Sequence, residues 1–127
     1  PHVRFILNPT ISVMNVLHFP DFYFDWIDKG FLPLREVYAN ILQVPEFYSI
    51  QILPMKFKQK VKDLYYESFC VKDQNKYLYD QIMGFMFQAD TTRYLPSFFH
   101  NVKQMDLLRN EDFFSIFPEL EELKNEL

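Results

Sequence analysis

The chain has 127 residues, a length typical of one domain, and we expect residues 1–127 to form a single domain. Aromatic residues make up 19% of the sequence and charged residues 24%, a balance that favours a buried core and opposes intrinsic disorder. The formal net charge of −4 lacks the basic footprint of nucleic-acid-binding proteins, so nucleic acid is not an expected partner.

The first predicted element is a short strand at residues 3–8, an apolar run that Pro9 ends. A helix is predicted next, with Pro20 in its first turn and Gly30 directly after its last. Its apolar residues recur at helical spacing and form one continuous face, made of Phe19, Phe22, Tyr23, Trp26 and Ile27.

A shorter second helix is expected at Leu34–Leu42, between Pro33 and Pro45. The alternating side chains of residues 47–53 then predict the clearest strand of the chain, which Pro54 ends. Because about forty residues with helical patterns separate the two strands, we expect them to pair in parallel.

The second half of the sequence predicts helices only. Asn110 is expected to cap a short turn, and Pro118 to begin a last helix over residues 119–126. The apolar faces of the three helices before them consist of Phe57, Val61, Leu64, Tyr65 and Ser68, then Leu78, Ile82, Phe85, Met86 and Ala89, then Phe98, Phe99, Val102 and Met105. The expected fold is therefore mainly helical α+β, with two short parallel strands at residues 3–8 and 47–53 packed with five to six helices.

Residues that could bind metals are few and scattered. One cysteine, Cys70, cannot supply a zinc or iron–sulfur ligand set, and His2, His18 and His100 have no metal-binding spacing, so no metal site is predicted. We expect Cys70 to be a buried structural thiol. A lone cysteine also favours a reducing, cytoplasmic location, and no apolar run approaches the length needed to span a membrane.

Polar side chains near the strands are the candidate ligand contacts, because ligands of parallel sheets gather at the carboxyl ends of the strands. Asn8, Thr10, Ser12 and Asn15 follow the first predicted strand, and Gln51 lies inside the second. Two interpretations remain open: these residues contact a ligand, or Asn8 to Thr10 form an ordinary turn.

Aromatic residues form three short stripes, which could pack in the core or line a groove for a protein partner. They are Phe85–Met86–Phe87, Phe98–Phe99 and Phe113–Phe114.

Several stretches occur in an order that resembles the C-terminal part of uncharacterised radical S-adenosylmethionine proteins of the twitch-domain type. The resemblance covers most of the chain and rests on short motifs: Asn8-Pro9-Thr10-Ile11-Ser12-Val13-Met14-Asn15-Val16-Leu17, Phe19-Pro20-Asp21-Phe22, Asp25-Trp26, Ile50-Gln51-Ile52-Leu53-Pro54, Asp106-Leu107-Leu108-Arg109-Asn110-Glu111-Asp112-Phe113 and Phe117-Pro118-Glu119-Leu120.

The resemblance implies that the two strands are late strands of a partial βα barrel and that the following helices close it. It also implies that Asn8, Ser12 and Asn15 lie nearest the S-adenosylmethionine of an intact parent. The family's Cys-x-x-x-Cys-x-x-Cys loop is absent here, so this chain alone should not hold the iron–sulfur cluster or perform radical chemistry.

Two hypotheses follow. In the first, the chain is a non-catalytic C-terminal piece, or a relic, of such an enzyme; the start without Met is consistent with a fragment. In the second, it is a self-contained helical module that binds a protein partner, or a second copy of itself, through an aromatic groove. A small enzyme that uses Cys70 and a histidine is the least favoured alternative.

Overall fold

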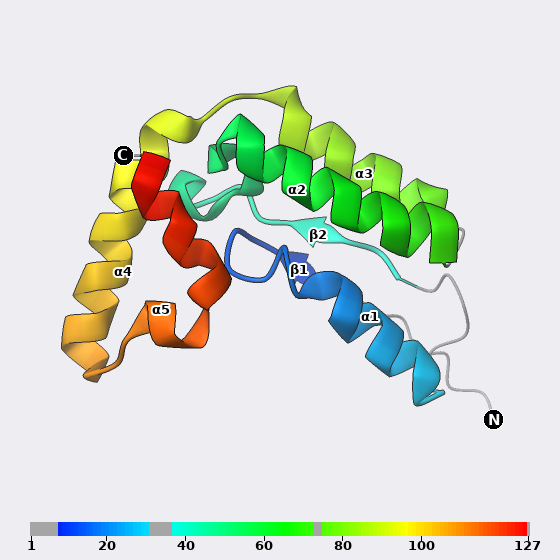
Figure 1. Cartoon of the computed structure of the whole chain (residues 1–127), viewed down its shortest axis with the longest axis horizontal. Helices are drawn as coiled ribbons and strands as arrows, with labels where there is room; N and C mark the ends of the chain where they lie inside the picture. Colours follow the sequence, from blue (N-terminus) through cyan, green and yellow to red (C-terminus); the bar gives the residue numbers. More distant parts are fainter. Residues whose placement is uncertain (1–7, 31–36, 73–74, 127) are drawn as a thin grey trace.

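The computed structural model describes residues 8–30, 37–72 and 75–126, and Figure 1 shows how they are arranged. Strands β1 (Thr10–Ile11) and β2 (Asn40–Ile41) pair in parallel, with Thr10 opposite Asn40 and Ile11 opposite Ile41. Helices dominate the rest of the described chain. The predicted class, mainly helical α+β with two short parallel strands, is therefore confirmed.

Helix α1 (Phe19–Asp28) connects the two strands, and its position agrees with the prediction. Pro20 lies in the first turn, where its missing N–H costs no helical hydrogen bond. Phe19 and Tyr23 are buried on the predicted face. The helix ends at Gly30, whose φ of 73° is left-handed and suits a residue without a Cβ.

The strand predicted at residues 47–53 is wrong. The segment instead forms two 3-10 turns, η1 (Glu46–Tyr48) and η2 (Ile50–Ile52). The Ser49 hydroxyl accepts a hydrogen bond from the Gln51 backbone N–H at 3.3 Å, a local bond that competes with strand pairing. The alternating pattern is not kept in the burial either: Ile50 and Ile52 are fully buried, but Leu53, expected on the opposite side, is fully buried too.

The other two N-terminal predictions fall partly outside the described residues. Residues 3–7 of the first expected strand lie outside the described residues. Its last residue, Asn8, is irregular, and β1 begins two residues later, at Thr10. Of the helix expected at 34–42, residues 34–36 also lie outside the described residues. For residues 37–42 the prediction is wrong, because β2 occupies this part of the chain. Val37 and Ala39 are buried while Tyr38 and Asn40 are exposed, so the ladder with β1 overrides local helix propensity.

Helices α2 (Met55–Tyr65) and α3 (Lys76–Gln88) agree with the predictions and lie side by side along one edge of the molecule in Figure 1. A π-helical segment, η3 (Tyr66–Lys72), continues α2 and buries Phe69. Asn75 accepts a hydrogen bond from the Leu78 N–H at 3.3 Å and caps α3.

The C-terminal part comprises η4 (Thr92–Tyr94), α4 (Leu95–Arg109), α5 (Phe113–Ile116) and η5 (Pro118–Glu126). The predicted last helix is present, in 3-10 form. The prediction that Asn110 caps the following turn is wrong: Asn110 ends α4 with a left-handed φ of 53°, and Asp112 occupies the N-cap position of α5. Asparagine tolerates both positions, so the sequence could not distinguish them.

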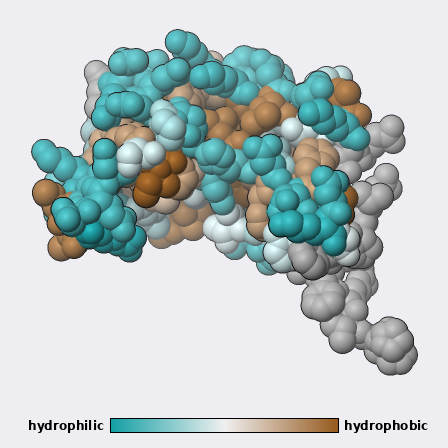
Figure 2. All heavy atoms as spheres, turned by 60° about the horizontal axis from the view of Figure 1, so that its bottom comes forward, coloured by the Kyte–Doolittle hydropathy of each residue, from teal (hydrophilic) through white to brown (hydrophobic). Residues whose placement is uncertain are grey.

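Most elements contribute to one hydrophobic core. Figure 2 shows one face of the molecule, where hydrophobic residues occur in separate places among hydrophilic ones. The core includes Ile11, Val13, Val16, Phe19, Tyr23, Ile50, Ile52, Phe57, Val61, Tyr65, Phe69, Leu78, Ile82, Met86, Phe98, Val102, Leu120 and Leu123.

Candidate functional site

The loop after β1 holds two of the three predicted cofactor contacts, and both use their polar atoms locally. The Asn15 side chain accepts a hydrogen bond from the Ser12 N–H at 2.9 Å and donates one to the Thr10 carbonyl at 2.8 Å. The Ser12 hydroxyl accepts from the Met14 N–H at 3.2 Å. These local bonds hold the loop after β1. The ordinary turn that is the alternative interpretation for Asn8 to Thr10 is not formed, because Asn8 and Pro9 are irregular and Thr10 begins β1. Asn8 is exposed and lies before β1.

A shallow hollow of about 280 Å³ lies beside this loop. Asn15 and Thr10 form part of its wall, together with Pro9, His18, Phe19 and Phe22. The His18 ring is 2.6 Å from a Glu119 carboxylate oxygen, which ties the start of α1 to η5. The exposed His18 side chain makes this a weak contact for stability.

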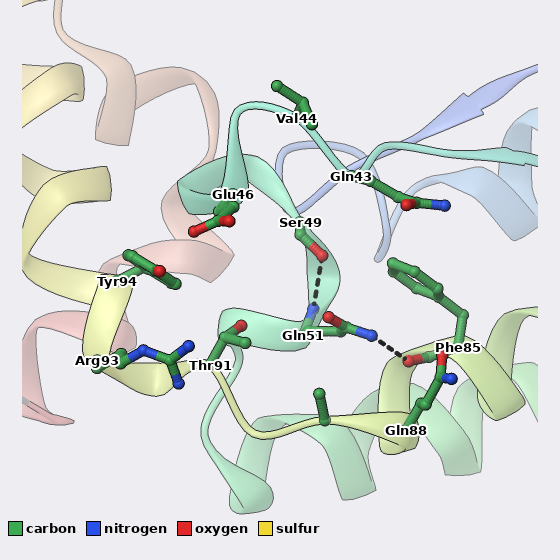
Figure 3. Close-up of a pocket in the computed structure, with 11 residues that line it drawn as sticks. Gln43, Val44, Glu46, Ser49, Gln51, Phe85, Gln88, Thr91, Arg93 and Tyr94 are labelled. Carbon is green, nitrogen blue, oxygen red and sulfur yellow. Dashed lines mark hydrogen bonds between the residues drawn. The ribbon is translucent and has the colours of Figure 1, made fainter.

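A larger and more polar pocket, of about 550 Å³, lies beyond the carboxyl end of β2. Figure 3 shows its lining, contributed by the loop after β2, the two turns η1 and η2, the end of α3 and the segment around η4. We call it the amide pocket, after its three glutamines. It is lined by Gln43, Val44, Glu46, Ser49, Gln51, Phe85, Gln88, Ala89, Thr91, Arg93 and Tyr94.

Gln51 is held in place in the middle of the amide pocket. Its side-chain N–H donates to the Phe85 carbonyl at 2.9 Å, and its backbone carbonyl accepts from the Thr91 N–H at 3.2 Å. Within the described residues, the Gln51 side-chain oxygen has no recorded partner. The Thr91 hydroxyl is buried and also has none there. An unpaired buried oxygen costs stability, so the Thr91 hydroxyl distinguishes the pocket from an ordinary surface hollow.

The charged groups of the amide pocket balance. Glu46 and Arg93 approach from the same side in Figure 3, but no ion pair joins them. The Arg93 guanidinium lies over the Tyr94 ring at 4.8 Å and donates to the Asp90 carbonyl at 3.4 Å. With one carboxylate and one guanidinium, the lining carries no net formal charge.

Lys58 does not line the amide pocket but bonds to one of its lining residues, Ala89. It is 2% exposed, and its ammonium donates to the Ala89 carbonyl at 3.0 Å, directly after the C-terminus of α3. Burial lowers the pKa of this ammonium, and the nearby Asp90 carboxylate raises it by a smaller amount. A cation at a helix C-terminus is favourable, so Lys58 holds the wall that carries Ala89 and Thr91.

Metal-binding groups do not converge in the part of the chain that the structure describes: no cluster of three or more His, Cys, Asp or Glu side chains occurs there. Cys70 is half-buried in the π-helical segment, less buried than predicted. Burial and the Asp80 carboxylate raise the pKa of its thiol. A protonated thiol is a poor nucleophile, so the geometry gives no support to a catalytic Cys70.

The aromatic stripes are divided between the core and surface hollows. Phe85 lines the amide pocket, and Phe99 and Phe114 line another hollow of about 450 Å³. Phe98 is fully buried, and its ring packs edge-to-face against Phe113 at 5.9 Å. Phe99 and Phe114 are partly buried and pack together at 5.9 Å. The more exposed apolar residues of this end are Leu107, Leu108 and Ile116, which sequence periodicity did not single out.

The sequence named Gln51 as a candidate ligand contact, although the strand in which it was expected is a 3-10 turn. It carried no signal for Gln88, Thr91 and Arg93, because these residues reach the pocket only through the packing of α3 and η4. Across the described ranges, no helix is long and apolar enough to cross a bilayer. No protein-family model, curated protein or solved structure matches this chain.

Proposed function

We propose that this chain is the C-terminal region of a cytoplasmic radical S-adenosylmethionine enzyme of the twitch-domain type, and that it performs no chemistry alone. The observation that carries the proposal is the β1–α1–β2 unit: two parallel strands joined by a helix, the repeating unit of a βα barrel. Three of the sequence motifs described above, at residues 8–17, 19–22 and 25–26, lie at the start of this unit.

The size of the sheet supports the proposal. Parallel sheets normally have several strands and are covered on both faces. Here each strand contributes two residues, and β1 pairs with β2 alone within the described residues. A ladder this short contributes little by itself, so the unit is better suited to extend a larger sheet than to form one.

The cofactors of such an enzyme place definite demands on this chain. A cluster that cleaves S-adenosylmethionine needs three thiolates, and Cys70 is the single cysteine, so the cluster must be held by another part of the parent. Ser12 and Asn15 bond to their own loop and do not fit as direct contacts of S-adenosylmethionine. In this proposal they shape the loop after β1. Asn8 precedes β1 and therefore lies at the amino end of that strand, away from the carboxyl end where ligands of parallel sheets gather.

An affinity tag placed after Leu127 in the native gene tests the proposal. The protein is purified without oxygen from its natural source, and its mass, iron content and consumption of S-adenosylmethionine are measured. We expect a polypeptide longer than the present chain, with about four iron atoms. A tagged product of 15.5 kDa plus the tag, without iron, would refute the proposal.

The variant Cys70→Ala provides the matched control. If the cluster ligands lie in another part of the parent, this variant retains the full iron content. Loss of iron in Cys70→Ala would show that the lone thiol is a ligand, and the division of roles proposed here would be wrong.

A second candidate is a protein-interaction module, favoured by one observation. Leu107, Leu108 and Ile116 are 72%, 80% and 59% exposed, and Leu107 and Leu108 are adjacent in the chain; apolar side chains that are exposed together mark interaction sites. A partner or a second copy would bind at this end of α4, not in a groove built from Phe98. Light scattering of Leu107→Lys/Leu108→Lys tests the dimer: a wild-type mass that falls by half in the variant supports self-association, and an unchanged monomer mass opposes it.

A further inference from the structure

We infer that the amide pocket binds a neutral nucleobase, either free or as a nucleoside. The inference does not depend on the proposed enzyme family. None of the residues that line this pocket lines the hollow beside Asn15, so it is separate from the predicted S-adenosylmethionine contacts.

The first argument is the hydrogen-bonding pattern. A carboxamide places an acceptor next to a donor in one plane, as do the edges of nucleobases, and glutamine pairs with such edges. The pocket presents Gln43, Gln51 and Gln88. Gln51 is already oriented by its bond to the Phe85 carbonyl, which leaves its side-chain oxygen without a partner in the described structure.

The second argument is Phe85. Its partly buried ring lines the pocket and makes no contact with another aromatic ring among the described residues. Figure 3 shows it opposite the side that carries Glu46, Arg93 and Tyr94. A partly exposed aromatic ring beside amide groups suits a flat heterocycle, which can stack on the ring while its edge bonds to the amides. A sugar ring would use the amides but gain little from this stacking.

The third argument is the Thr91 hydroxyl, which is buried without a partner although Thr91 lines the pocket. Rotation about χ1 to another staggered rotamer moves the threonine hydroxyl to the position of the methyl group or of the Cβ hydrogen. In the proposed complex the Thr91 side chain takes the rotamer in which the hydroxyl bonds to the ligand. Binding would thus remove the cost of an unpaired buried oxygen.

Charge and size limit the ligand further. Glu46 and Arg93 cancel, so the lining offers no net positive charge for a phosphate. A volume of about 550 Å³ accommodates a nucleoside and lies within the usual range for small-molecule sites. A nucleoside is therefore expected to bind at least as tightly as its 5′-monophosphate.

Calorimetric titration of the full chain tests the inference, with adenosine, guanosine, cytidine and uridine, their 5′-monophosphates, ribose and S-adenosylmethionine as probes. We expect saturable binding of at least one nucleoside at concentrations up to about 1 mM. No binding of any nucleoside, equal binding of ribose, or tighter binding of the monophosphate or of S-adenosylmethionine would overturn the inference.

Three variants locate the site. Thr91→Val should weaken binding roughly tenfold while it stabilises the free protein, because valine keeps the shape and removes the unpaired oxygen. Phe85→Leu should also weaken binding roughly tenfold through lost stacking. The matched control is Thr92→Val: its hydroxyl bonds to Asp90 at 2.7 Å and does not line the pocket, so affinity should stay unchanged. Wild-type affinity in both Thr91→Val and Phe85→Leu would place the ligand elsewhere.

Discussion

The buried hydroxyl of Tyr65 offers the sharpest test of the packing described above. Tyr65 is fully buried among the rings of Phe19 and Phe69, and its hydroxyl donates to the Val16 carbonyl at 2.5 Å. The residue four positions after Val16 is Pro20, which has no N–H to offer that carbonyl. Tyr65 therefore supplies the hydrogen bond that proline removes.

Replacing Tyr65 with Phe leaves this carbonyl unpaired, since Val16 is 1% exposed and water cannot reach it. An unsatisfied buried acceptor costs about 1–3 kcal/mol. With an unfolding entropy of about 2.1 cal/mol/K per residue, a loss of about 2 kcal/mol lowers the Tm of this domain by roughly 7 °C.

Urea denaturation and thermal melting measure the effect. Tyr66→Phe is the matched control, because Tyr66 is 55% exposed and has no recorded hydrogen bond to the described protein; its free energy of unfolding should change by less than about 0.5 kcal/mol. If the two variants were equally stable, the Tyr65 hydroxyl would contribute nothing and the account of Pro20 would fail.

Tyr65 also predicts a pH dependence. Burial raises the pKa of its hydroxyl far above the ordinary value. The folded state thus keeps its proton where the unfolded chain loses it, so the contribution is complete below about pH 10 and declines as the pH rises further. Denaturation at a series of alkaline pH values should show a steeper loss of stability for the wild type than for Tyr65→Phe; parallel curves would contradict the prediction.

The remaining predictions concern three other positions. Lys58→Met should lower the free energy of unfolding by about 1–2 kcal/mol, because the Ala89 carbonyl loses a charged donor. The control Lys60→Met breaks the exposed Lys60–Glu122 pair and should lower it by less than about 1 kcal/mol. Equal losses in urea denaturation would refute this prediction. Asn110→Gly should be nearly neutral in thermal melting and Asn110→Val should cost about 1–2 kcal/mol, because φ is left-handed there; equal stability of the two variants would show that the left-handed cap is unimportant. Cys70 should react with iodoacetamide more slowly in the folded chain than in urea at about pH 8, because its raised thiol pKa and its partial burial both protect it; equal rates would contradict this.

The sequence by itself determined helices α1 to α4 and most of their buried residues, but not the segment at 37–42, where a helix was expected and β2 forms. Phe19 and Tyr23 of α1, or Phe57 and Val61 of α2, recur at helical spacing, and a helix that buries one face needs no information from distant residues. It also determined the fold class, because strands separated by a helix pair in parallel. The lone cysteine limited the metal chemistry in the same way, since ligand counting requires no structure.

Only the tertiary structure decided where the strands and the pocket lie. Asn40–Ile41 forms a strand because Thr10–Ile11 lies beside it. Ile50–Ile52 instead forms a 3-10 turn, before which the Ser49 hydroxyl accepts a hydrogen bond from the Gln51 N–H. The amide pocket joins Gln51, Phe85 and Thr91, which approach one another through the packing of α3 against the turns after β2. Local patterns report which side of an element is buried, but partners distant in the chain are chosen by packing, and that information is not contained in any short stretch of sequence.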